Sequence, residues 1–200
     1  MGDTILSLDT HTPDESTGQP LTRTDVAKLL QEVENSANLD LSCRNMRGID
    51  LSEFDLAGAR LDRANLMAAN LSDADLSKAS LVGTNLCGAI LVSTNLSEAN
   101  LNEADMIGAN CITANFSSSD LSKANLTRAM LLMSNLSGAR LEQANLSGAC
   151  MSRANLSEAT LEHANLSGSI LKDACMREME KASLCNRGII DLEKVRIIAS

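Results

Sequence analysis

A five-residue period runs through most of the chain and limits its fold more than any other feature of the sequence. Every fifth residue from Leu41 to Met176 is apolar, which makes 28 positions in register, and 22 of them are Leu. From Ala59 onward a small residue, most often Ala, stands two positions before each of these. A period of five matches neither the roughly 3.6 residues of a helical turn nor the roughly two residues of a plain strand. The chain is therefore expected to turn once in every five residues and to point both repeated positions inward.

The residue between the small position and the Leu position is commonly Asn or Asp, whose side chains bond nearby backbone and favour turns. When these residues are sorted by their place in blocks of twenty, two of the four classes hold Asn or Asp at 13 of 14 positions and the other two at 6 of 14. Units that nearly always hold Asn or Asp at this position, called strict, thus alternate with relaxed units that often hold another residue. Two opposite pairs of sides in a 20-residue coil explain this alternation, although the count alone does not prove four sides.

Units of the form A-(D/N)-L-x-x, such as residues 64–68 and 144–148, resemble the pentapeptide-repeat family over about 140 of the 200 residues. The resemblance implies an all-β fold, a right-handed quadrilateral β-helix in which each coil contains four pentapeptides and the Leu and small side chains stack inside. On that geometry the 28 units form about seven coils. At about 4.8 Å between coils, the rod is roughly 34 Å long.

Composition agrees with a stacked core and limits the partners. The chain has no Trp, no Tyr and two Phe, so its core must consist of Leu, Ala and Met. The net charge of −9 argues against direct binding of nucleic acid or of an anionic membrane, which both depend on basic patches. No apolar run approaches the roughly 20 residues of a membrane span, and the first 20 residues lack a signal-peptide pattern, so a cytoplasmic location is expected.

The repeat is flanked by two segments that we expect to cap it, because an open solenoid end exposes a sheet edge and a Leu layer. We assign residues 1–20 to a disordered tail, 21–36 to an N-terminal capping helix, 38–178 to the solenoid and 179–200 to a C-terminal cap. The helix is expected from Arg23 to about Glu34, with Thr22 and Asp25 as a capping box. A partner-binding helix is the alternative for the first segment, and a dimerising strand for the last.

The sequence offers little material for catalysis, and we predict that the protein is not an enzyme. Its two His, His11 and His163, fall in the tail and at an outward repeat position. The six Cys show no paired spacing, which predicts reduced thiols, not a zinc site or disulfides. A Gly-rich phosphate loop is also missing. No catalytic residue, cofactor site or metal site is therefore predicted.

Apolar residues at outward positions of the central coils form the candidate interaction surface. Exposed contiguous apolar area commonly marks an interface, although a surface without a partner can also accumulate such residues. The sequence thus favours a non-catalytic protein–protein interaction scaffold, with an unknown protein or a second copy of the chain as its partner. The candidate residues are Ile90, Val92, Ile107, Ile112, Met130, Leu132 and Met133.

The family resemblance also suggests an alternative, since some bacterial members resemble B-DNA and protect DNA gyrase from quinolones. Duplex DNA carries one negative charge per about 1.7 Å, so a mimic of roughly 34 Å needs on the order of 20 charges. Residues 38–176 contain 15 acidic and 10 basic side chains, a net charge of −5. A DNA mimic that binds gyrase or another topoisomerase is therefore the second hypothesis.

Overall fold

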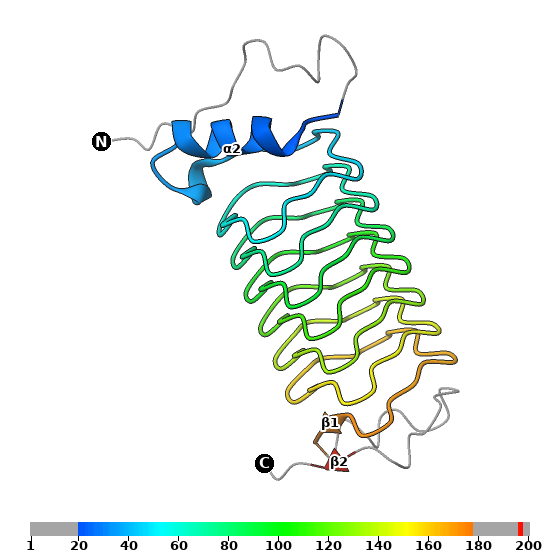
Figure 1. Ribbon diagram of the computed structural model, residues 1–200. Coiled ribbons are helices and arrows are strands. Elements are labelled where there is room, and N and C mark those ends of the chain that lie inside the picture. Colours follow the sequence, from blue (N-terminus) through cyan, green and yellow to red (C-terminus); the bar gives the residue numbers. More distant parts are fainter. Residues whose placement is uncertain (1–19, 178–195, 198–200) are drawn as a thin grey trace.

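The computed structural model describes residues 20–177 and 196–197 as a helix laid on one end of a stack of short coils (Figure 1). In these residues helix α2 spans Arg23–Glu32 and the 3-10 helix η1 spans Ser36–Asn38. Strand β1 spans Cys175–Met176 and strand β2 spans Arg196–Ile197. The predicted tail lies outside the described residues except for Pro20, and so does the predicted C-terminal cap except for β2.

The coils contain four pentapeptides each. The residue before each inward position forms a parallel β-bridge with the residue twenty places later, from Asp40 with Arg60 to Asn155 with Cys175. Between coils, the backbone N–H of an inward residue donates to the carbonyl 19 residues later, as Leu66 does to Asn85 at 2.8 Å. Below, each side of the rod is named after its first inward residue: the Leu41, Met46, Leu51 and Leu56 sides.

Each corner contains one residue in the left-handed backbone conformation, a feature that the sequence did not reveal. In each corner the N–H of the small residue donates to the preceding Leu carbonyl, as from Ala64 to Leu61 at 3.0 Å. The second residue after the Leu position has a positive φ in every described unit, with nineteen non-glycine residues and eight glycines. The Asn before the Leu does not adopt this conformation. Instead its side chain accepts a hydrogen bond, as Asn65 Oδ1 does from the N–H of Met67 at 3.2 Å.

The inward columns form the core, as the period predicts. Leu66, Leu86 and Met106 are fully buried, and their neighbours are bridged coil to coil, so the three stack in one column. Hydroxyl groups that replace the inward Ala are satisfied locally. Thr84 donates to the Leu61 carbonyl of the previous coil at 2.7 Å, and Ser119 donates to the Phe116 carbonyl of its own turn at 2.8 Å. The hydroxyls at these inward positions therefore do not carry the cost of missing hydrogen bonds.

Helix α2 covers the first coil. Thr22 and Asp25 form the predicted capping box, and Val26 is fully buried in the core. Leu29, Leu30 and Val33 pack against the same core. The helix ends at Glu32, two residues before the predicted end, because Val33 adopts extended dihedrals and packs its side chain inward.

Arg23 joins helix α2 to the rod. Its guanidinium donates to the carbonyls of Asp50 and Ser52, both at 3.1 Å, and lies 3.3 Å from the Asp50 carboxylate. It also lies 4.4 Å from the centre of the Phe54 ring, a cation–π distance. One side chain thus fixes the start of the helix at three points on the first coil.

Gly58 is required by the contact between the rod and the segment after the helix. Its φ is +72°, and a Cβ there lies 2.8 Å from the Ala37 Cβ. Gly48 has a similar φ of +68°, but a Cβ added there meets no atom within 4 Å. A substitution of Gly48 therefore measures the cost of the positive φ without a steric overlap. We expect Gly48→Ala to cost about 1–2 kcal/mol.

Gly58→Ala is expected to cost at least about 1 kcal/mol more than Gly48→Ala, because the new methyl group overlaps Ala37. Thermal unfolding of both variants measures the difference. Adding Ala37→Gly to Gly58→Ala removes the overlap and restores part of the loss. Equal destabilisation by the two single variants contradicts a close contact at this corner.

At the other end, β2 pairs with β1 in parallel, with Arg196 opposite Cys175. The N–H of Arg196 donates to the Ala174 carbonyl at 2.7 Å. The paired residues are 21 positions apart, not the 20 of the regular coils. Strand β2 therefore pairs with the β-edge at the end of the last regular coil.

Candidate interaction surface

The seven candidate residues lie close together at the middle of the rod, and we call them the central patch. Six belong to the Leu51 side, and Ile107 lies around the corner on the Met46 side. Four large apolar side chains are exposed in the described part of the chain, and all four belong to the patch: Ile90, Ile107 and Met130 at 41% and Met133 at 47%. Val92, Ile112 and Leu132 are half-buried.

Backbone hydrogen bonds hold the patch in rows. Ile90 is bridged to Asn110, and Asn110 to Met130, so one row crosses three coils. The carbonyls of Ile112 and Leu132 each accept an N–H from the preceding coil at 3.0 Å, which places Val92, Ile112 and Leu132 in a second row. Because the backbone fixes both rows, the patch is a rigid surface and needs no side-chain contacts to form.

The surroundings of the patch are almost uncharged. Residues 85–93, 105–113 and 125–133 cover two adjacent sides of three coils, and two of them are charged, Asp105 and Arg128. Gly88 and Gly108 occupy corners there, so little side-chain bulk separates Ile107 from the rest of the patch. Apolar side chains on a flat, weakly charged surface are suited to contact with a protein.

The opposite Leu41 side carries ion-pair clusters that the sequence did not reveal. Arg60 lies 3.1 Å from Asp40 and 3.8 Å from Asp62. Four coils further on, Arg140 lies 3.4 Å from Asp120 and 3.7 Å from Glu142. Equal spacing in the sequence does not show which charges meet, because partners come from different coils.

Hydrogen bonds lower the pKa values of two carboxyl groups in these clusters. Burial raises the pKa of Glu142, but the Thr160 and Ser122 hydroxyls and the charge of Arg140 outweigh it, so its pKa lies below the ordinary value. The pKa of Asp40 is lowered in the same manner, by bonds from Ser42 and the charge of Arg60 against the effect of burial. Both carboxylates are therefore charged at neutral pH and neutralise their arginines.

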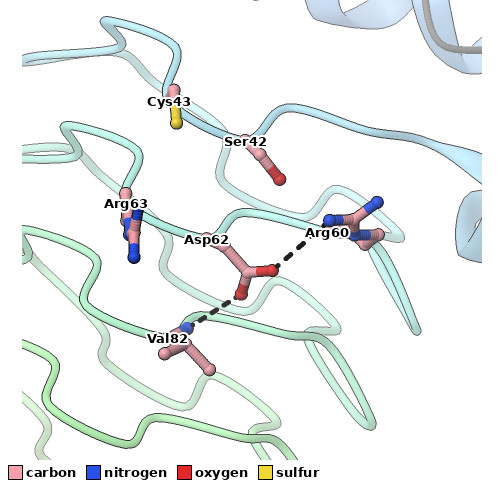
Figure 2. Close-up of a pocket in the computed structure, with 6 residues that line it drawn as sticks. All are labelled: Ser42, Cys43, Arg60, Asp62, Arg63 and Val82. Atoms are coloured by element: carbon pink, nitrogen blue, oxygen red, sulfur yellow. Dashed lines mark hydrogen bonds and ion pairs between the residues drawn. The ribbon is translucent and has the colours of Figure 1, made fainter.

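Figure 2 shows a shallow hollow of about 370 Å³ beside the first cluster. Asp62 fills its centre, where it accepts the N–H of Val82 at 3.0 Å and pairs with Arg60. The hydroxyl of Ser80 also donates to Asp62. The Asp62 carboxylate is thus already bonded within the hollow. The residues that line the hollow are Ser42, Cys43, Arg60, Asp62, Arg63 and Val82.

The remaining reactive side chains of the described residues are thiols and one exposed imidazole. Burial raises the pKa of the Cys111 thiol to about 12, so this inward Cys stays protonated. Burial and the neighbouring Asp105 raise the pKa of Cys87 as well. His163 is exposed and lies 3.5 Å from Glu162. Within the described residues, no group of three His, Cys, Asp or Glu side chains is arranged to hold a metal ion.

The sequence model "Pentapeptide repeats" matches the chain in eight copies, over residues 45–81, 69–106, 94–131, 109–148 and 134–173. The chain belongs to the pentapeptide-repeat family. The family resemblance predicted from the A-(D/N)-L-x-x units is therefore confirmed. Membership of the pentapeptide-repeat family makes the stack of coils a right-handed β-helix, the solenoid of this family.

Solved structures of QnrB1 share this fold. The chain is similar to full-length QnrB1, a plasmid-mediated fluoroquinolone resistance protein, at 21% identity and a TM-score of 0.57, over 77% of this chain and 82% of that one. A trypsin-treated form of QnrB1 is 22% identical with a TM-score of 0.57, over 80% of this chain and 83% of that one. HetL, a protein involved in heterocyst differentiation regulation from the cyanobacterium Nostoc, gives 24% identity and a TM-score of 0.41, over 88% and 94%. No curated protein matches the sequence.

Among the residues that the structure describes, no helix is both long enough and apolar enough to cross a bilayer.

Proposed function

We propose that this pentapeptide-repeat protein is a non-catalytic scaffold that binds a protein through the central patch. The observation that carries the proposal is the gathering of the four exposed large apolar residues in one weakly charged area of an otherwise polar rod. Contiguous exposed apolar area commonly marks an interface, and a solenoid presents it on a rigid surface. A cytoplasmic location and a rod of about seven four-sided coils are part of the same proposal.

The double variant Ile112→Ser/Leu132→Ser tests the scaffold. Both side chains point outward, so the variant is expected to keep the circular dichroism spectrum and thermal midpoint of the native protein. Burying an apolar side chain of this size is worth up to about 1.5–3 kcal/mol, so binding through the patch should weaken at least about tenfold.

The immobilised native chain, incubated with cytosol, should retain a set of proteins that the double variant loses. Val82→Ser is the matched control, because it replaces a half-buried outward apolar residue by Ser on the opposite side. The control should retain the same set as the native chain. Identical sets for all three proteins, together with an unchanged native mass, contradict binding through the patch.

Gyrase protection is the second candidate function, and the likeness in fold to QnrB1 is the observation that favours it. The charges do not favour it, since Arg60 and Arg140 are paired with the carboxylates that a DNA mimic needs free. We expect the purified protein, up to roughly micromolar concentration, to leave DNA supercoiling by gyrase unchanged with and without a quinolone. A protective effect of the protein on supercoiling in the presence of the drug would establish this function in place of the first.

A further inference from the structure

The apolar residues of the Leu51 side are centred on its middle coil. Counting twenty residues per coil from Leu41, the patch occupies the third, fourth and fifth of about seven coils, with Ile112 on the fourth. On the basis of the scaffold function above, we propose that the partner is a second copy of this chain, packed side by side and antiparallel along the Leu51 side.

A two-fold axis that crosses the middle of this side, perpendicular to the rod, places each coil opposite the coil at equal distance from the centre. Each outward row then faces the same row of the second copy. Ile112 faces its own counterpart, and Val92 faces Leu132. In the next row, Ile90 faces Met130. Five apolar residues of the patch thus face apolar residues of the second copy, whereas Met133 faces Ser93 and Ile107 lies on the Met46 side, outside the contact. No charged residue of the Leu51 side lies among the three central coils.

The flanking coils of this side carry opposite charges. Asp73 lies on the second coil and Arg153 on the sixth, in the same row, and both side chains are exposed. The antiparallel arrangement brings Asp73 of each copy opposite Arg153 of the other, which makes two ion pairs per dimer. On the outermost coils Glu53 faces Asp173, and the neighbouring Lys172 offsets this like-charge contact.

A parallel arrangement is less favourable for the same residues. In that arrangement each coil of one copy faces the same coil of the other. The residues just before the inward positions of one copy then face the corner residues, two positions after the inward ones, of the other copy. This brings Asp50 of one copy toward Glu53 of the other, twice per dimer, and Asp73 toward Asn70. Each arrangement thus contains one kind of like-charge contact, but the two Asp73–Arg153 pairs form in the antiparallel dimer and are lost in the parallel one, so the charge pattern favours the antiparallel dimer.

The contact area predicts a weak dimer. One side of a seven-coil rod measures roughly 34 Å by 10 Å, since coils are about 4.8 Å apart and three extended residues span about 10 Å. Two copies together bury on the order of 700 Å² in projection, below the roughly 1,200 Å² of a stable standard interface. We therefore expect reversible dimerisation with a dissociation constant on the order of 10–100 µM.

Sedimentation equilibrium of the full chain tests the dimer. At several hundred micromolar the mass should approach twice the 21.2 kDa of the monomer, and the Ile112→Ser/Leu132→Ser variant should remain at 21.2 kDa with unchanged circular dichroism. Asp73→Arg and Arg153→Asp should each raise the dissociation constant about tenfold, because two attractive pairs become repulsive. The double variant Asp73→Arg/Arg153→Asp exchanges the two charges and should return to within about threefold of native.

Thiol cross-linking tests the antiparallel orientation. Thr113 lies at the corner of the middle coil and faces its own counterpart across the two-fold axis. Thr113→Cys should therefore form a disulfide-linked dimer under mild oxidation. The control Ser118→Cys lies on the same coil but at the next corner, and it should form far less of this dimer.

The outcomes separate the two proposals. A native chain that stays monomeric at several hundred micromolar overturns the dimer, and the scaffold stands if the double variant still loses a cytosolic protein. A dimer whose dissociation constant is unchanged in Ile112→Ser/Leu132→Ser overturns contact through the Leu51 side. Failure of the charge exchange to restore affinity, or equal cross-linking of Thr113→Cys and Ser118→Cys, overturns the antiparallel arrangement.

Discussion

Replacing Phe116 by Ala is expected to lower the free energy of unfolding by about 3–5 kcal/mol. Phe116 is fully buried and is the largest side chain in its inward column. Its carbonyl accepts a hydrogen bond from the Ser119 hydroxyl, and its backbone N–H donates to the Asn135 carbonyl in the next coil at 2.7 Å. Backbone bonds hold the coils at a nearly fixed spacing, so the neighbouring layers cannot collapse into the cavity. Urea unfolding followed by circular dichroism measures the loss.

Phe116→Leu is the matched control for this cavity. Five other inward positions of the same column hold a buried Leu, from Leu56 to Leu156, so this substitution restores the column to its common residue. We expect a loss below about 1.5 kcal/mol. If Phe116→Ala were no worse than Phe116→Leu, the coils would be able to close around a cavity and the core would not be rigidly spaced.

Ala109→Leu is expected to be equally severe, at about 3 kcal/mol or more, for the opposite reason. Ala109 is fully buried at a small inward position, and its N–H donates to the Met106 carbonyl at 3.1 Å within a tight corner. A Leu side chain there needs space that the inward residues already fill. The coil has to open, which breaks backbone bonds to the coils on both sides.

Ala68→Leu makes the same chemical change at an exposed corner residue with a positive φ of 57°. It is expected to change stability by less than about 1 kcal/mol, because the added atoms reach solvent. Thermal unfolding of the two variants side by side provides the measurement. Similar midpoints for Ala109→Leu and Ala68→Leu would contradict the assignment of the small residues to the interior.

The interior was predictable because it repeats. An inward position every five residues recurs 28 times, so single exceptions such as Cys111 or Phe116 do not hide the pattern. The outward positions follow from it, and with them the seven residues of the central patch. Their role in binding remains a prediction, since exposure shows only where they lie.

On one of the two sides that hold Asn or Asp at nearly every position, the structure gives a physical reason for this preference that the sequence did not show. On the Leu56 side the Asn amides form a ladder from coil to coil, each donating to the side-chain oxygen one coil earlier at 3.0–3.2 Å. Within a ladder each residue needs a matching neighbour twenty positions away, so substitutions are restricted there. The members are Asp75, Asn95, Asn115, Asn135 and Asn155.

The amino-acid sequence alone determined the five-residue turn, the inward columns, the family and the outward set of apolar residues, because each depends on a local pattern that recurs along the chain. The tertiary structure decided which side chains meet across coils: Arg23 on the first coil, Gly58 under Ala37, and Arg60 between Asp40 and Asp62. These contacts occur once or twice along the chain, and all but the Arg60–Asp62 pair join residues 20 or more positions apart, so they leave no periodic signal. Only the winding of the chain brings them together.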